Sequence, residues 1–350
     1  MPSVDRRLQV WRAARVILGA VLAVGFMALA FRGVDLGRLG DVIRRANVAL
    51  LGLALILGSA NLLVRAARWR VLLSAAGRVP FRLTFWIMAV GYLGNSILPM
   101  RAGDLGRSYL IGRRAGMGGT FALATTLAER VMDAGFLVVV GGIALVGHPA
   151  IPVALSRGLA VLAAASFVAL VGLLAIPPVW DRLASRLEAI PRLTSPLGRL
   201  RRRWLDRFFA GLASIRHPGR MVLYLALTVA IWLADAGATM LVARALGANI
   251  ALPAAVVLLA ALGVTSAIPI SPGQIGIYQF VVASVIGSYG IAREPAVLLA
   301  LSLQALNYLL LLTWGVTGTL RLGGLDLLRT LSRLPAATAD PYAPSEDGDG

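Results

Sequence analysis

NSILPMRAGDLGRSY, residues 95–109, follows a long hydrophobic run and interrupts it with a proline, two glycines, an arginine and an aspartate. Proline removes a backbone donor and stops a helix, and glycine permits tight turning. The stretch therefore predicts a broken helix with its turn at Pro99–Gly106. We expect a helical hairpin over about 83–112.

The composition shows in which class of protein this break occurs. Hydrophobic residues make up 58% of the 350-residue chain, charged residues only 14%, and the mean hydropathy is +0.81. These values indicate an integral membrane protein, and its spans must be helical to satisfy their backbones. The stretches that are long or nearly long enough to cross a bilayer are Val16–Phe31, Val48–Val64, Phe121–Val146, Val153–Ile176, Met221–Ala243, Ala254–Ile270 and Ala296–Leu320.

The net charge of +18 comes from arginines at the ends of hydrophobic runs, so we expect no nucleic-acid partner. The positive-inside rule assigns the arginine-rich loop 178–220 to the cytoplasm or its interface. The rule does the same for arginines on both sides of 83–112, so the first hairpin is predicted to be re-entrant. These are Arg65, Arg68, Arg70, Arg78 and Arg82 before it, and Arg113 and Arg114 after it.

A second break resembles the first one. Residues 266–276 read SAIPISPGQIG, and at an offset of 170 their Ser, Pro and Gly residues match those of 96–106. This indicates an internal duplication with a second hairpin at about 253–291. Counted from a cytoplasmic N-terminus, about six transmembrane helices place the two hairpins on opposite faces, as in inverted-repeat transporters, with a cytoplasmic C-terminus. The predicted fold class is all-α and polytopic.

The ends of the chain are predicted separately. The first apolar run fits a cleaved signal peptide or a first membrane helix, and we expect the uncleaved helix because further membrane segments follow. We assign residues 1–334 to one membrane domain. The acidic tail 335–350 should be disordered.

Charged residues also occur inside a predicted span. Glu129 and Asp133 are four residues apart and share a helix face, and Arg130 can pair with Asp133. Each such charge costs about 2.5–3.5 kcal/mol in hydrocarbon, so these groups should face a polar cavity or one another. Arg101 and Asp104 of the first break should lie nearby.

The functional interpretation of this cluster is a headgroup site. Arg101 and Arg130 would bind phosphate, which suits a planar guanidinium. Glu129, Asp133 and Asp104 would complete the cavity and could bind a proton or an amine. The alternative is a buried ion-pair cluster that fixes helix register. Arg107 is interpreted as an interfacial residue whose head reaches solvent. A polar counterpart from the other half is predicted from Asp235, Gln304 and Asn307.

The two breaks supply the remaining candidate binding residues, because the N-terminus of a new half-helix can attract an anion. The alternative is that the breaks serve only close helix packing. These candidates are Pro99, Gly103, Gly106, Pro269, Gly273, Gln274 and Gly276.

Catalytic templates find little support. The chain has no cysteine, its two histidines stand beside prolines at segment ends, and it contains no phosphate-binding loop of the ATPase type. We predict no catalytic residue, metal or cofactor.

Four segments together resemble the flippase-like membrane domain of lysylphosphatidylglycerol synthases, over roughly residues 10–325. They are RAARWRVLL (Arg65–Leu73), GNSILPMRAGDLGR (Gly94–Arg107), LAERVMD (Leu127–Asp133) and PISPGQIGIY (Pro269–Tyr278). The resemblance implies movement of a lipid between leaflets. The sequence stops at Gly350, soon after its last predicted span, so no aminoacyl-transfer domain is visible and synthesis of lysylphosphatidylglycerol is not expected.

The leading hypothesis is a multi-pass lipid transporter of the bacterial inner membrane. Its partners would be a phospholipid or a polyprenyl-phosphate lipid and a separately encoded lipid-synthesis enzyme, with homo-oligomerisation left open. One alternative is a membrane enzyme acting on a polyprenyl-phosphate lipid, with Asp104 and Glu129 as acid, base or metal ligands. Another is a non-transporting scaffold for a lipid-synthesis enzyme.

Overall fold

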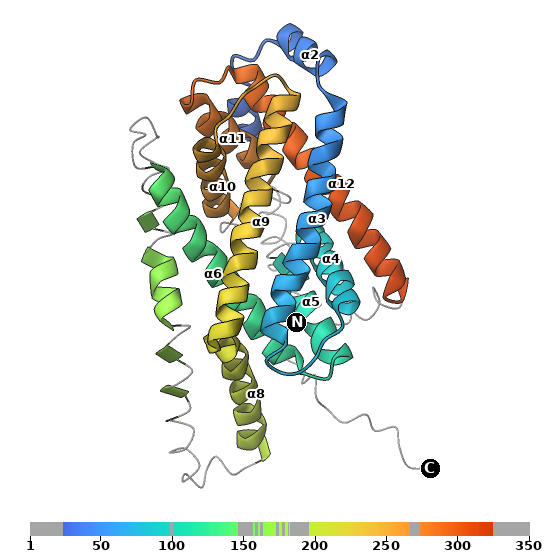
Figure 1. Cartoon of the computed structure of the whole chain (residues 1–350), viewed down its shortest axis with the longest axis vertical. Helices are drawn as coiled ribbons and strands as arrows, with labels where there is room; N and C mark the ends of the chain where they lie inside the picture. Colours follow the sequence, from blue (N-terminus) through green and yellow to red (C-terminus); the bar gives the residue numbers. More distant parts are fainter. Residues whose placement is uncertain are drawn as a thin grey trace, which may run out of the picture.

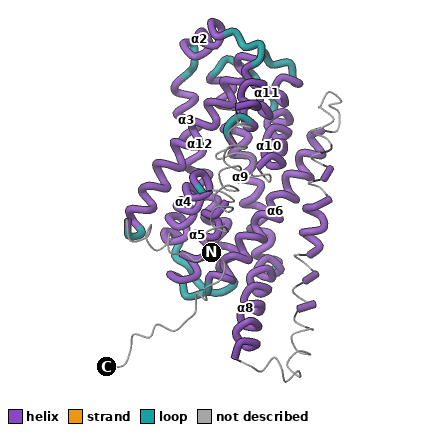
Figure 2. The backbone as a smooth tube through the Cα atoms, turned by 180° about the vertical axis from the view of Figure 1, so that it is seen from behind, coloured by secondary structure: helices purple, strands orange, loops and turns teal. Residues whose placement is uncertain are grey.

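The computed structural model describes residues 24–98, 101–145, 157, 160–161, 164–172, 175–176, 179–180, 182, 196–266 and 274–324. Within them all regular structure is helical (Figures 1 and 2). The described elements are α2 (Leu36–Arg44), α3 (Val48–Leu73), α4 (Phe81–Ile97), α5 (Ala102–Arg114), α6 (Gly119–Leu145), α8 (Pro196–Ala213), the 3-10 turn η3 (Ser214–Arg216), α9 (Pro218–Ala245), α10 (Leu252–Ser266), α11 (Ile277–Ser288) and α12 (Arg293–Arg321).

Three described helices, α3, α9 and α12, are long and apolar enough to cross a membrane, and α10 and α11 are shorter apolar helices. The protein is therefore a multi-pass membrane protein. α6 has 27 residues but carries three charges near its middle. The predicted span Val16–Phe31 is described only from residue 24, and the predicted span Val153–Ile176 only in pieces, so the number of crossings stays a prediction.

α3 and α9 lie side by side along the length of the molecule and run in opposite directions (Figure 1). At one end the Asn47 amide donates to the Ala245 carbonyl at 2.8 Å. Towards the other end Arg68 donates to Thr228 at 3.2 Å. Residue numbers rise along α3 as they fall along α9, so the pair is antiparallel.

Both predicted hairpins are pairs of packed helices, and they lie at opposite ends of the molecule. α4 packs on α5 in the lower half of Figure 1, and α10 packs on α11 in the upper half. Each pair belongs to its own hydrophobic core, one built mainly from α3, α4 and α5 and the other mainly from α9 to α12. The second pair spans 252–288, close to the predicted 253–291.

The turn of the first hairpin is shorter than predicted. α5 begins at Ala102, so Gly103 and Gly106 lie inside a helix and not in the turn predicted at 99–106. Gly103 is where α5 meets α4: a Cβ added there would collide with the Gly91 carbonyl and lie 2.5 Å from the Asn95 amide. Pro99, like Pro269 and Gly273 of the second break, lies outside the described residues.

The helix order is the same in the two halves of the chain. At the sequence offset that aligns the two breaks, α3, α4, α5 and α6 correspond to α9, α10, α11 and α12. The packing crosses between the halves, because α4 packs on α12 and α6 packs on α10. A Cβ on Gly315 of α12 would lie 2.5 Å from Leu93 of α4, and one on Gly141 of α6 would lie 2.6 Å from Ala260 of α10.

α3 is longer than predicted. The predicted span is Val48–Val64, but the helix continues to Leu73. The predicted end of this span at Val64 is therefore wrong, since Arg65, Arg68 and Arg70 all lie within the helix. Arg78 and Arg82 are exposed outside α3.

The basic segment 178–220 contains α8, which packs on α6. A Cβ on Gly211 of α8 would lie 2.6 Å from the Phe121 carbonyl. The tail 335–350, predicted to be disordered, lies outside the described residues.

Candidate functional site

One face of α3 carries polar side chains in an otherwise apolar helix. Asn61, Arg65 and Arg68 recur at helical spacing, and the neighbouring Trp69 extends the row. Asn61, Arg68 and Trp69 are buried. A buried charge is stable only when paired, so the partners of these residues define the site.

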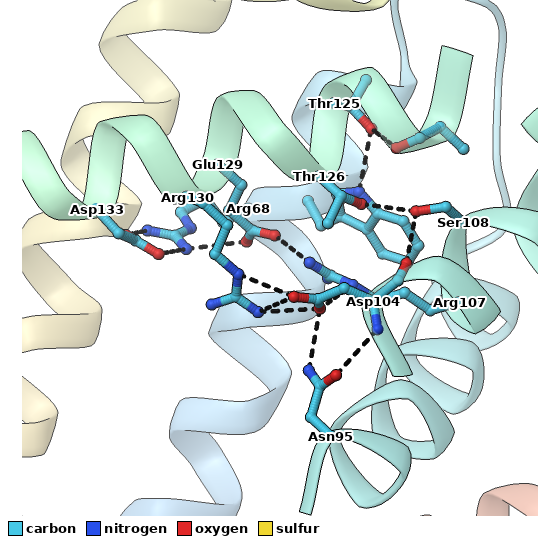
Figure 3. A network of polar contacts seen from close by, with 12 residues as sticks. Arg68, Asn95, Asp104, Arg107, Ser108, Thr125, Thr126, Glu129, Arg130 and Asp133 are labelled. Carbon is cyan, nitrogen blue, oxygen red and sulfur yellow. Dashed lines mark hydrogen bonds and ion pairs between the residues drawn. The ribbon is translucent and has the colours of Figure 1, made fainter. Parts of the chain in front are cut away.

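Arg68 joins both carboxylates of α6. It donates to the two oxygens of Asp133 at 2.5 and 2.9 Å and to Oε1 of Glu129 at 2.9 Å (Figure 3). Its guanidinium also lies over the ring of Tyr224, 5.1 Å from the centroid. The structure thus confirms that Glu129 and Asp133 share a face, and one arginine serves both.

Arg107 binds the other side of Glu129. It donates from Nη2 to Oε2 at 2.8 Å, and its Nε lies 3.1 Å from Oδ1 of Asp104. The guanidinium stacks over Trp69 at 4.5 Å. Arg107 is 0% exposed, so the prediction that it reaches solvent at the interface is wrong.

Asp104 is the centre of the outer part of the cluster. Arg130 donates to it from Nε at 3.1 Å and from Nη2 at 2.9 Å. The Asn95 side chain accepts from the Asp104 backbone amide at 3.0 Å and donates to the Asp104 carboxylate at 3.1 Å, tying α4 to α5 (Figure 3). Arg130 thus pairs with Asp104 and not, as predicted, with Asp133.

The cluster has a closed end and an accessible end. The side chains of Arg68, Arg107 and Glu129 are at most 1% exposed, whereas those of Asp104 and Arg130 are 13% and 30% exposed. Nη1 of Arg130 makes no hydrogen bond within the described part of the chain, and Figure 3 shows this nitrogen turned away from Asp104. Solvent or a ligand therefore reaches the cluster first at Arg130.

Arg101 stands beside this accessible end. It is exposed, directly precedes α5, and interacts electrostatically with Asp104 and Arg130. Its φ of 52° lies in the left-handed region, which is unfavourable for a residue with a side chain. Such strain often marks functional positions.

A second ion pair lies further along α3. Arg65 donates to Asp235 of α9 at 2.5 Å, and Asn61 donates to the other oxygen of Asp235 at 2.6 Å. Asp235 was predicted to join Gln304 and Asn307. The prediction is wrong for Asp235, because its carboxylate contacts α3 instead.

The second hairpin is polar but uncharged. Gln279 accepts from the Gly276 amide at 2.7 Å and donates to Gln304 of α12. Gly276 has a φ of 88°, which glycine adopts without strain. Gln274, two residues earlier, has a φ of 58°, so among the described residues each hairpin has one strained residue with a side chain close to its turn.

The sequence interpretation missed the two innermost arginines. The positive-inside rule marks Arg68 as cytoplasmic and the sequence predicts an interfacial Arg107, but both side chains are fully buried. A signal was present, because arginines at three- to four-residue spacing that continue an apolar helix can share one face.

No group of three metal-ligating side chains occurs among the described residues.

Comparisons with known proteins agree with a membrane domain. The model of the family described as Lysylphosphatidylglycerol synthase TM region matches residues 16–315. Glycosyltransferase AglD of Haloferax volcanii is 27% identical over 142 residues, which is 40% of this chain and 23% of that protein. The match thus spans less than a quarter of the length of this curated relative. No solved structure matches the chain significantly.

Proposed function

The chain belongs to the lysylphosphatidylglycerol synthase TM region family, and we propose that it moves a polar or anionic lipid between the leaflets of a bacterial inner membrane. The observation that carries the proposal is the ion-pair cluster inside the helix bundle. Three arginines and three carboxylates meet there, and one end is accessible beside the first hairpin. Intramembrane charges are costly and commonly mark a substrate path.

The two hairpins supply the proposed path. α4, α5, α10 and α11 have 17, 13, 15 and 12 residues, whereas a straight crossing takes about 20 residues. We therefore treat each pair as a re-entrant hairpin. Their positions at opposite ends of the bundle and the shared helix order support an inverted repeat. Substrate sites of such transporters lie between the repeats.

The headgroup would bind at the accessible end of the cluster. A lipid phosphate would contact Nη1 of Arg130 and the guanidinium of Arg101, while Asp104 holds Arg130 in place. Arg68, Arg107 and Glu129 would support these groups from behind. The acyl or prenyl tails would stay in the bilayer throughout.

The arginine distribution favours entry from the cytoplasmic side. Exposed arginines gather where α3, α5 and α12 end and α4 begins. They are Arg70, Arg78, Arg82, Arg113, Arg114 and Arg321. The positive-inside rule makes this end cytoplasmic, and the first hairpin lies at the same end (Figure 1).

The test is lipid movement in liposomes that contain the purified protein. Lipids labelled with a fluorophore on one tail are quenched by dithionite only in the outer leaflet, so translocation appears as loss of the protected signal. We expect wild type to accelerate this loss and Arg130→Gln to abolish it. Arg113→Gln removes the same charge from the exposed end of α5 and should retain activity.

A second candidate is an enzyme acting on a membrane lipid, suggested by the name of the partly matching glycosyltransferase. The two carboxylates it would use as acid or base, Asp104 and Glu129, are each held by two arginines. Mass spectrometry of the same liposome lipids would reveal a chemically altered product. Intact lipids that change leaflet would exclude this candidate.

A further inference from the structure

The carboxylates within α5, α6 and α9 have a common feature: each is already paired with an arginine. The four acids within α5, α6 and α9 each lie 2.5–3.1 Å from an arginine nitrogen. They are Asp104, Glu129, Asp133 and Asp235. None of them is left to neutralise a cationic ligand.

The donors are in excess instead. The four carboxylates pair with Arg65, Arg68, Arg107 and Arg130, and some guanidinium nitrogens of these arginines have no acceptor within the described residues. Nη1 of Arg107 is buried and has no hydrogen-bond acceptor within the described residues. Nη1 of Arg130 likewise makes no hydrogen bond within the described part of the chain, and it lies at the accessible end of the cluster, where a ligand can reach it. A buried donor without a partner is costly, so a ligand oxygen would be favourable.

The opposite hairpin offers no compensation for a cation. The described residues of α10, of α11 and of 274–276 include no acidic side chain. Their polar groups near the turn are the carboxamides of Gln274 and Gln279, and a carboxamide carries no net charge. A bound ammonium group would therefore be left unpaired on both sides of the proposed path.

We infer that the translocated lipid carries a phosphate and no amine, so that it is anionic and not aminoacylated. This inference rests on the proposed function and narrows it. A phosphodiester such as phosphatidylglycerol and a phosphomonoester such as a polyprenyl phosphate share this chemistry. An aminoacyl ester of phosphatidylglycerol adds an ammonium group, which is costly to desolvate without a carboxylate beside it.

The experiment compares three tail-labelled lipids in the liposome assay: phosphatidylglycerol, its lysyl ester and a short polyprenyl phosphate. We expect at least one of the two phosphates without an amine to move at least about tenfold faster than the lysyl ester. Faster or equal movement of the lysyl ester would overturn the inference while leaving lipid transport intact. Comparison of phosphatidylglycerol with the polyprenyl phosphate shows whether the protein prefers a phosphodiester or a phosphomonoester.

If no lipid moves, the proposed function is wrong. The preference for a lipid without an amine can then still be tested by a binding measurement. A ligand that binds only the folded state raises the unfolding temperature, by roughly 3 °C or more when it is well above its Kd. In detergent we expect this shift with an anionic lipid, a smaller one with the lysyl ester, and none with Arg130→Gln. An equal or larger shift with the lysyl ester, or no shift with any of the lipids, would refute the inference. Arg113→Gln should behave as wild type.

Discussion

Arg65 and Asp235 form an ion pair across a sequence offset of 170, with 2.5 Å between Nη2 and Oδ2. The same offset aligns the two breaks and relates the helices of the two halves. It also separates Asn61 from Ile231, whose carbonyl accepts from the Asn61 amide at 3.3 Å. In the proposed inverted repeat, equivalent positions of the two halves would touch only near the shared axis. These contacts would place that axis between α3 and α9.

Removing one partner of this pair should destabilise the protein without preventing folding. The side chains are 20% and 26% exposed, so Asp235→Ala should cost roughly 1–3 kcal/mol, between the values for surface and buried pairs. Because the two positions are nearly equivalent, the reversed pair Arg65→Asp with Asp235→Arg should recover part of the loss. A double-mutant cycle on unfolding temperatures in detergent measures this. No recovery would argue against equivalent environments.

Substitution of Arg68 should destabilise the protein more than loss of the Arg65–Asp235 pair. Arg68→Ala leaves Glu129 and Asp133 without their common partner in a fully buried site, which should cost about 3–5 kcal/mol. We expect little folded protein by fluorescence-detected size-exclusion chromatography. Arg78→Ala removes the same charge from an exposed loop and should change stability by less than about 0.5 kcal/mol. Equal yields of the two variants would contradict a structural role for Arg68.

Substitutions of Arg107 and Arg130 should affect different properties, stability for Arg107 and translocation for Arg130. Arg107 is fully buried, so Arg107→Gln should lower the unfolding temperature strongly. Arg130 is 30% exposed at its side chain, so Arg130→Gln should lower translocation at least about tenfold, or about 1.4 kcal/mol, with a smaller loss of stability. Thermal unfolding and the liposome assay on each variant give the comparison. The reverse order of effects would move the binding end of the cluster to Arg107.

Gly103 should not accept a side chain. A Cβ there meets the Gly91 backbone, so Gly103→Ala must push α4 and α5 apart, at a cost of about 1–3 kcal/mol typical of overpacking. A Cβ on Gly135 of α6 meets nothing within 4 Å. Gly135→Ala is therefore the matched control and should be neutral or stabilising. Similar losses at both sites would indicate that helix propensity, and not helix contact, is being measured.

The opposite orientation of the halves can be tested by labelling, since the chain has no native cysteine. Ala76 follows α3 and Ala251 precedes α10, and both are exposed. In whole cells a membrane-impermeant maleimide should label Ala251→Cys, whereas Ala76→Cys should react only after the membrane is opened. Labelling of both cysteines from one side would rule out an inverted repeat.

The sequence predicted the helices better than the contacts between them. Hydropathy located α9 and α12 within about three residues, and the repeated Ser-Pro-Gly pattern located both pairs of short helices, because these signals are local. The spacing of Glu129 and Asp133 likewise predicted one shared face. The predictions that a span ends at Val64, before Arg65 and Arg68, and that Arg107 is interfacial were wrong.

Those failures have one physical cause. An arginine at the end of an apolar run can reach water or bind a distant carboxylate, and the run itself is the same in both cases. Arg68 finds its partners 61 and 65 residues away, and Arg107 finds Glu129 22 residues away. Asp235 is paired with α3 for the same reason, although its predicted polar neighbours lie on α12. Such partners depend on helix packing, which one sequence does not specify.

The position of the charges on α6 has a consequence for biosynthesis. Glu129, Arg130 and Asp133 would each resist entry into lipid if α6 emerged alone, at roughly 2.5–3.5 kcal/mol per charge. Their partners Arg68, Asp104 and Arg107 are all translated earlier in the chain. When α6 leaves the ribosome, α3 and α5, which carry the opposite charges, have already been synthesised. The growing chain can therefore neutralise α6 as it is inserted, before any part of the second half has been made.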